Sequence, residues 1–333
     1  MKEKLIAWIL SLVMAAGGAA GAVPGSGAME IFSSSYALRA PEFPEMVPYP
    51  DNETLSSGGE YNWEEWNAQQ SERREAAESY QGKLDAYLKT ALPALLKPQK
   101  GSDNAVCSPV NVWFALAMAA ETADGDTRRE ILDLLGSDSV EDLRKTAVSL
   151  WKANYCDDGA ATVRLGASLW MNQDIDFKET TLQTLAKDYF AASFRGSMAD
   201  PEYSKAFKQW LDEMTGGLLK GNIDQLDDFS PSDVMALATT VYFSAKWMLE
   251  FDENNTYPET FHGAKGDTQA DFMHRSSEGT YYWDDRFGAV EMPFTESGSM
   301  WLILPGEGVT PADLVDSGEA LAFLNKSWSE KQS

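Results

Sequence analysis

The stretch VMALATTVYFSAKW at residues 234–247 carries more information about the fold than any other part of the chain. It is almost continuously apolar, and it is rich in the β-branched and aromatic side chains that fit a pleated, buried surface. A run of this kind, without an alternating polar face, is typical of a strand that is buried on both faces. The sequence therefore predicts a central strand at residues 234–247, with other layers of the fold packed above and below it.

Three further stretches predict strands. Residues 162–171 alternate between apolar and other side chains with a period of two, which is the spacing of a β-strand. Residues 289–294 and 300–304 are both mainly apolar, and residues 295–299 between them are rich in turn formers, so this pair predicts a hairpin. Together with the central strand, these segments indicate large, mixed sheets.

Helices are predicted between the strands by apolar spacing and by capping signals. Apolar residues recur at helical spacing over residues 80–96. Ser108 suits an N-cap, because its oxygen accepts a bond from an unpaired N–H, and Pro109 suits the first helical position, where no N–H is needed. Similar helix starts are indicated at Ser139, Pro201 and Thr310. The alternation of helices and strands predicts large, mixed sheets that helices cover.

Residues 1–22 predict a secretory signal peptide. Lysines give a positive start, an apolar core follows at residues 5–14, and Ala20-Gly21-Ala22 provides a cleavage site. The apolar core is too short to span a hydrocarbon layer of about 30 Å, although an uncleaved membrane anchor is the competing interpretation. We expect export to the extracellular space or the cell envelope, with a mature chain that starts near Val23.

Residues 23–78 form an acidic segment that is rich in proline, serine and glycine and has poor periodicity. This composition predicts an extended or disordered arm. Tyr49, Tyr61, Trp63 and Trp66 are the groups that would dock such an arm locally, but a solvated linker fits the composition better. The folded domain is expected over residues 79–333.

The composition of the 333-residue chain excludes several classes of function. A net charge of −25 repels phosphate backbones, so we expect no nucleic-acid partner. The histidines, His262 and His274, do not have the spacing of a metalloprotease motif, and two cysteines are too few for a Cys-rich zinc site. We therefore expect no metal and no small-molecule cofactor. The sequence allows one disulfide, between Cys107 and Cys156, but the apolar surroundings of Cys107 favour a free thiol.

Four blocks of the chain resemble the sequence pattern of the serpin family. In the family's order they are NAVCSPVN (104–111), WLDEMTGG (210–217), TVYFSAKW (240–247), and VEMPF with MWLILP (within 290–305). Their order and spacing make the signal specific. The resemblance covers roughly residues 80–328, and the predicted leader makes the chain similar to a secreted serpin of bacterial type.

The resemblance implies an α+β serpin fold of multi-stranded mixed sheets and covering helices. It also implies a serine or cysteine protease inhibitor that acts as a suicide substrate. A target protease, the one partner implied, attacks an exposed loop, which then inserts into the main sheet as a new strand. The catalytic residues belong to the protease, so no enzyme activity is implied for this chain. The strand at 234–247 would be one wall of the insertion slot, and the segment 201–219 would be the helix that yields.

The resemblance also carries structural positions over to this chain, namely Asn104, Ser108, Pro109, Thr215 and Trp247. Trp247 would lie near the entry of the slot, although a plain core aromatic explains this residue equally well. Several residues depart from the family pattern in ways that bear on sheet opening, namely Asn111, Ala167, Thr239 and Ala245.

No reactive-centre loop can be placed in the sequence up to Ser333, so the resemblance implies a serpin domain that is incomplete on its C-terminal side. We expect that the chain as given does not inhibit, and that the strand at 234–247 presents an open, aggregation-prone edge. A non-inhibitory serpin-like binding or surface protein is the alternative. A weaker alternative is a serine acyl enzyme of the penicillin-binding type. The S-x-x-K at Ser149 and the S-D-N at Ser102 stand in the reverse of that family's order, and the sequence contains no K-T-G.

Overall fold

The computed structural model describes residues 29–50, 61–96, 106–263, 265–295 and 297–325, together with the backbone of residues 9–15. The chain divides into two compact units. The first comprises Met1–Tyr87 and Cys107–Ser244, and the second comprises Leu88–Val106 and Ala245–Ser333. The first unit therefore extends across residue 79, where the sequence predicted the start of the folded domain.

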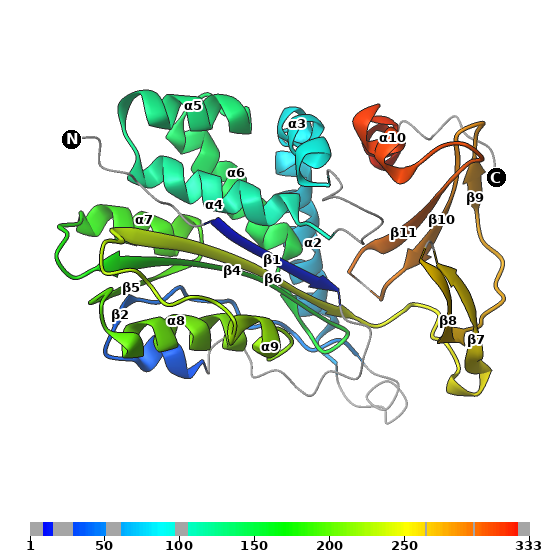
Figure 1. Cartoon of the computed structure of the whole chain (residues 1–333), viewed down its shortest axis with the longest axis horizontal. Coiled ribbons are helices and arrows are strands. Elements are labelled where there is room, and N and C mark those ends of the chain that lie inside the picture. The colour runs from blue at the N-terminus through cyan, green and yellow to red at the C-terminus, as the bar shows by residue number, and fades with distance from the viewer. Residues whose placement is uncertain are drawn as a thin grey trace. The chain divides into compact units, whose positions relative to one another are not determined.

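The first unit is built on a six-stranded sheet with the order β1-β6-β4-β5-β2, and β3 pairs with β4 (Figure 1). The strand predicted from the apolar run is β6, and its side chains are buried from Ala236 through Thr240. The sheet contains parallel and antiparallel pairs, as predicted. The strands of this sheet are β1 (Ile9–Ala15), β2 (Ala37–Arg39), β3 (Cys156–Asp157), β4 (Ala161–Asn172), β5 (Ala191–Gly196) and β6 (Met235–Ala245).

Within the predicted leader, residues 9–15 form β1 (Ile9–Ala15), while residues 5–8 of its apolar core lie outside the described residues. This strand pairs in parallel with β6, from Ile9 opposite Leu237 to Ala15 opposite Phe243. The expectation that the edge of β6 is open is therefore wrong for the chain that includes its leader. The physical reason is that an unpaired strand edge carries free N–H and C=O groups, which a nearby apolar segment can satisfy. Cleavage of the leader stays a prediction.

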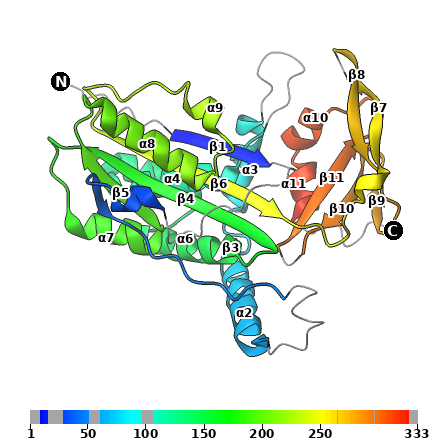
Figure 2. The same cartoon turned by 90° about the horizontal axis from the view of Figure 1, so that it is seen from below.

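Helices cover both faces of this sheet, as predicted, with α4 to α7 on one face and α8 and α9 on the other (Figure 1, Figure 2). The predicted caps are confirmed, because Ser108 Oγ accepts from Asn111 N at 3.2 Å and Ser139 Oγ accepts from Asp142 N at 3.1 Å. The helices are α4 (Pro109–Thr122), α5 (Gly125–Leu135), α6 (Val140–Asn154), α7 (Glu179–Asp188), α8 (Pro201–Met214) and α9 (Lys220–Ile223).

The predicted solvated arm is wrong for the residues that the structure describes within it. Residues 29–50 contain the 3-10 helix η2 (Glu30–Ser33) and the strand β2 (Ala37–Arg39), which pairs with β5. Downstream, α2 (Trp63–Tyr80) packs on α6. The proline-rich composition concealed widely spaced apolar anchors, and these anchors bury enough surface to order the segment. Residues 23–28 and 51–60 of the predicted arm lie outside the described residues.

The second unit contains two small antiparallel sheets. A hairpin of β7 and β8 forms one, and β11-β10-β9 form the other, in which the predicted hairpin is confirmed by pairing from Phe287 to Pro293. Its core joins Phe287 and Ala289 to Leu314 and Phe323 of the C-terminal helices. The elements are β7 (Thr256–Gly263), β8 (Gly266–Met273), β9 (Tyr281–Trp283), β10 (Phe287–Pro293), β11 (Ser299–Pro305), η3 (Glu253–Asn255), α10 (Pro311–Asp316) and α11 (Glu319–Leu324).

The remaining helix predictions are also confirmed. The helix predicted over residues 80–96 is α3 (Asp85–Leu95), and the start predicted at Thr310 is a complete capping box with Asp313. Within the described ranges, no helix combines the length and the apolar character needed to cross a bilayer.

Candidate functional site

The elements that the resemblance links to function are β6, α4 on one face of the sheet and α8 on the other. Ser108 and Pro109 form the start of α4, where Pro109 takes the first helical position. The Tyr87 hydroxyl donates to the carbonyl oxygen of Pro109 at 2.9 Å, and burial raises the pKa of Tyr87 well above its usual range. Ser108 and Pro109 thus fix the helix start, while Asn104 lies outside the described residues.

Two of the departures from the family pattern meet each other between α4 and β6. The Thr239 hydroxyl donates to the backbone oxygen of Asn111 at 3.1 Å, and both residues are buried. The Asn111 side-chain amide lies 3.3 Å from Thr240 O and 3.3 Å from Val241 N, with its nitrogen toward the carbonyl and its oxygen toward the N–H. The sequence identified Asn111 and Thr239 as separate substitutions, and the structure shows them to be one polar contact that holds β6 against α4.

On the opposite face, α8 approaches the sheet very closely at Gly166 of β4. A Cβ atom on Gly166 would lie 2.4 Å from Met214 Cε and 2.5 Å from Thr240 Oγ1. Both distances are far below ordinary van der Waals contact, so only glycine fits between α8 and β6 without movement. Thr215 closes the C-terminal end of α8, because its buried hydroxyl donates to Leu211 O at 2.7 Å.

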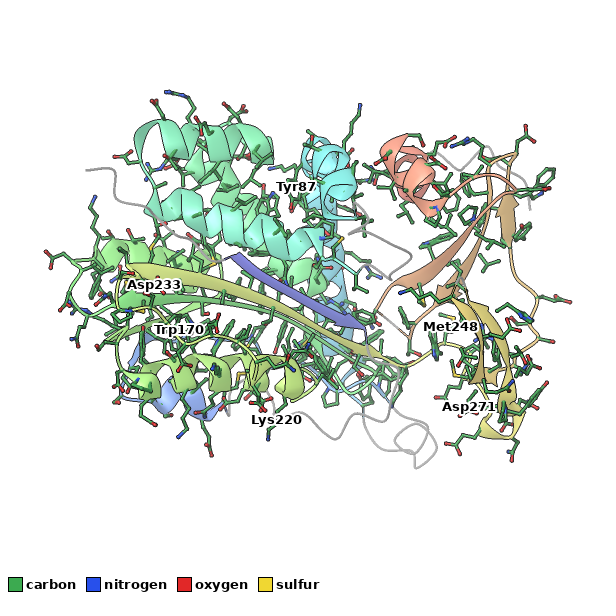
Figure 3. All side chains as sticks on the ribbon, viewed as in Figure 1. Tyr87, Trp170, Lys220, Asp233, Met248 and Asp271 are labelled. Atoms are coloured by element: carbon green, nitrogen blue, oxygen red, sulfur yellow. The ribbon has the colours of Figure 1, made fainter. Side chains whose placement is uncertain are left out.

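Aromatic packing and one polar anchor fix α8 to β4. Trp170 lies between the sheet and α8, where it stacks on Phe194 at 4.0 Å and tilts against Tyr203 at 5.4 Å (Figure 3). The Tyr203 hydroxyl donates to Met171 O at 3.1 Å and accepts from Met171 N at 3.1 Å. Burial raises the pKa of Tyr203, so the phenol stays neutral and can make both bonds. The sequence predicted a helix that starts at Pro201 but gave no sign of this anchor.

Trp247 belongs to the second unit, whereas Ser108, Pro109 and Thr215 belong to the first. Trp247 stacks on Phe294 with ring centroids 4.5 Å apart, and the two residues form an isolated antiparallel bridge. Met248 N donates to Pro293 O at 3.0 Å beside this pair. These contacts support the interpretation of Trp247 as a packing aromatic.

The chemistry-bearing side chains do not assemble into a reactive group in the part of the chain that the structure describes. Lys152 of the S-x-x-K pair forms an ion pair with Glu72 at 2.5 Å. Cys107 and Cys156 are free, and burial, the largest cause, together with Asp158 raises the pKa of Cys156 to about 12. Over the described ranges, no group of three or more histidine, cysteine, aspartate or glutamate side chains has the arrangement of a metal site.

The comparisons with known proteins agree with this architecture. The family model "Serpin (serine protease inhibitor)" matches residues 89–331. An uncharacterized serpin-like protein of Thermococcus kodakarensis is 30% identical over 222 residues, which cover 64% of this chain and 51% of that protein. A serine protease inhibitor of Cyanea capillata is 27% identical over 244 residues, which cover 69% of this chain and 62% of that protein. The chain therefore spans about half to three fifths of the length of these relatives.

Solved structures show the same fold. The thermophilic serpin tengpin in its native state gives a TM-score of 0.64 at 24% identity, with 75% of this chain and 64% of that chain covered. The structure of cleaved kallistatin gives a TM-score of 0.63 at 18% identity, with 78% of each chain covered. The residues that the family model matches, 89–331, make up well over half of the 333-residue chain. The chain belongs to the serpin family.

Proposed function

We propose that the protein is a protease inhibitor that acts as a suicide substrate, and that β6 is the strand beside which an inserted strand pairs. Membership of the serpin family supports a protease-inhibitor type of function in general. The role of β6 in strand insertion is supported by the seven-residue pairing of β1 along β6. This pairing supports the proposal that the edge of β6 from Leu237 to Phe243 accepts an added strand.

In this mechanism the protease supplies the catalytic residues and the chain supplies the receiving sheet. An incoming strand gains main-chain hydrogen bonds along β6, which is the source of affinity in strand addition. The tight approach of α8 at Gly166 and the Tyr203 anchor on Met171 oppose rearrangement of that sheet. The contact between Asn111 and Thr239 holds β6 to α4 from the other face. These contacts would set the barrier to insertion.

The predicted leader has a second role in this proposal. While residues 1–22 are attached, β1 occupies the edge of β6, and removal of the leader at Val23 would free the edge for another strand. The mature chain rather than the precursor would then be the form that takes up a strand and tends to associate through the edge.

The test uses the chain that begins at Val23 and a synthetic peptide with the sequence ILSLVMA, flanked by lysines for solubility. We expect the peptide to raise the thermal midpoint of this chain, and to do so much less for residues 1–333, whose edge is already paired. The control peptide carries proline in place of Leu12 and Val13, because proline cannot donate to a strand ladder. Equal effects of both peptides would contradict the proposal, and no effect of either would favour the non-inhibitory alternative.

We further propose that residues 1–333 alone do not trap a protease, since no scissile loop is assigned among them. Residues 1–333 are incubated with trypsin-, chymotrypsin- and subtilisin-like proteases, and the products are separated on a denaturing gel. We expect cleavage fragments without any covalent complex. A stable band at the summed mass of protease and chain would show that a reactive bond lies within residues 1–333.

A further inference from the structure

Residues 29–50, here named the belt, follow the surface of the first unit and contact α8 near both of its ends (Figure 2). Near the C-terminal end of α8, Ile31 N donates to Glu213 Oε2 at 3.3 Å. At its N-terminal end, the Tyr36 hydroxyl donates to Asp200 Oδ2 at 3.3 Å. Asp200 is the N-cap of α8, so the belt contacts the residue that defines where this helix begins.

Apolar burial accompanies these two bonds. Ile31 is only 1% exposed, and it belongs to the same core cluster as Tyr203, Trp210 and Met214 of α8. The Tyr36 ring lies 5.0 Å from that of Tyr203, the residue that anchors α8 to β4. Burial, and then the Asp200 carboxylate, raise the pKa of Tyr36, so its phenol remains a donor. The belt therefore covers α8 with a buried side chain as well as with polar bonds.

The belt is also attached to the sheet beside α8. Its strand β2 pairs with β5, with Ala37 opposite Phe194 and Arg39 opposite Ser193. Arg195 N donates to Tyr36 O at 2.9 Å and extends this pairing toward α8. A single segment thus contacts the helix and forms a strand of the sheet on which the helix rests.

Farther along, side chains and backbone fasten the rest of the belt. The Phe43 ring lies 5.8 Å from Trp151 of α6. Gln69 of α2 accepts from Val47 N at 2.9 Å and donates to Glu45 O at 3.2 Å, so one side chain holds two backbone groups of the belt. Tyr49 N donates to Asp158 O at 2.6 Å. The belt is therefore fixed at its far end to α2, α6 and the backbone of Asp158, in addition to its contacts with α8.

We infer that the belt is a latch that holds α8 on the sheet and controls how readily this helix separates from it. If α8 moved away, it would have to break the bonds at Glu213 and Asp200 and expose Ile31, or pull β2 from β5. The latch itself is a property of the fold. Its consequence, a barrier to strand insertion, rests on the proposed function.

The test is amide hydrogen exchange of the full chain carrying Ile31→Ala, with Leu38→Ala as the matched control. Both changes truncate an aliphatic side chain of the belt, but Leu38 is 45% exposed and Ile31 is 1% exposed. We expect the amides of α8 to exchange at least tenfold faster in Ile31→Ala, while those of α4 and α6 change little. In Leu38→Ala all three helices should exchange as in the parent chain.

A second variant keeps the test decisive if Ile31→Ala folds poorly. Tyr36→Phe retains the ring and removes only the bond to Asp200, and we expect a smaller acceleration of exchange that begins at the first turn of α8. Unchanged exchange of α8 in both variants would overturn the latch, as would an equal acceleration in α4, α6 and α8, which would indicate a general loss of stability. These outcomes involve neither a protease nor an added strand, so they are independent of the test of the proposed function.

Discussion

Gly166→Ala should destabilise the first unit, because the new methyl group has no room between α8 and β6. Its carbon would lie 2.4 Å from Met214 Cε and 2.5 Å from Thr240 Oγ1. Met214 ends in a flexible thioether and can move, but Thr240 is β-branched and fully buried, so its side chain has few other rotamers. Overpacking of this kind costs about 1–3 kcal/mol. We expect about 2 kcal/mol, since one of the two contacts can be relieved.

The matched control is Gly221→Ala in α9, where the added carbon would meet nothing within 4 Å apart from its chain neighbours and the backbone of its own helix. Alanine is favoured over glycine in a helix by about 0.5–1 kcal/mol, so this change should be neutral or slightly stabilising. Urea denaturation followed by circular dichroism measures both variants, and the midpoints are compared at equal m-values. If Gly166→Ala is as stable as the parent chain, α8 is not packed against the sheet at this point.

Three further predictions concern single residues and the leader. Ser108→Ala should lower the free energy of unfolding by about 1 kcal/mol through the lost bond to Asn111 N, as measured by urea denaturation, and loss of a hydrolytic activity at unchanged stability would contradict the structural role. Cys156, whose thiol pKa is raised to about 12, should resist a thiol reagent at pH 8 until the chain is unfolded, and rapid labelling of the native Cys156 would show that it is not buried. Protein recovered from the producing cells should begin near Val23 on N-terminal sequencing, whereas full-length protein retained in the cytoplasm would disprove export.

Local sequence signals predicted the parts of the fold that depend on neighbouring residues. Ser108, Ser139 and Thr310 each cap a helix as expected, because a capping bond spans only three residues. The apolar run became β6, since a strand buried on both faces needs no alternation. Such features depend little on the rest of the chain, and this explains why they were visible without it.

Long-range contacts explain what the sequence did not predict. Ile31 is a single apolar residue in a polar, proline-rich segment, and its partners on α8 lie about 180 positions away, as the bond to Glu213 shows with a separation of 182. The contact between Thr239 and Asn111 spans 128 positions. Composition averages over such isolated anchors, so the belt was predicted to be solvated. The close approach at Gly166 left no signal beyond a glycine inside a strand.

Disulfide cross-linking of residues 1–333 tests directly whether the edge of β6 receives a strand in register. Val13 lies opposite Val241 in the pairing, whereas Leu12 lies opposite Thr240. Val13→Cys with Val241→Cys is therefore compared with Leu12→Cys and Val241→Cys, both without the natural cysteines. Directly paired positions have the Cα separation that a disulfide needs, and a shift of one residue turns the side chain to the other face of the sheet. We expect rapid intrachain cross-linking of the first pair and little of the second, whereas equal or absent cross-linking would show that β1 does not pair with β6 in this register.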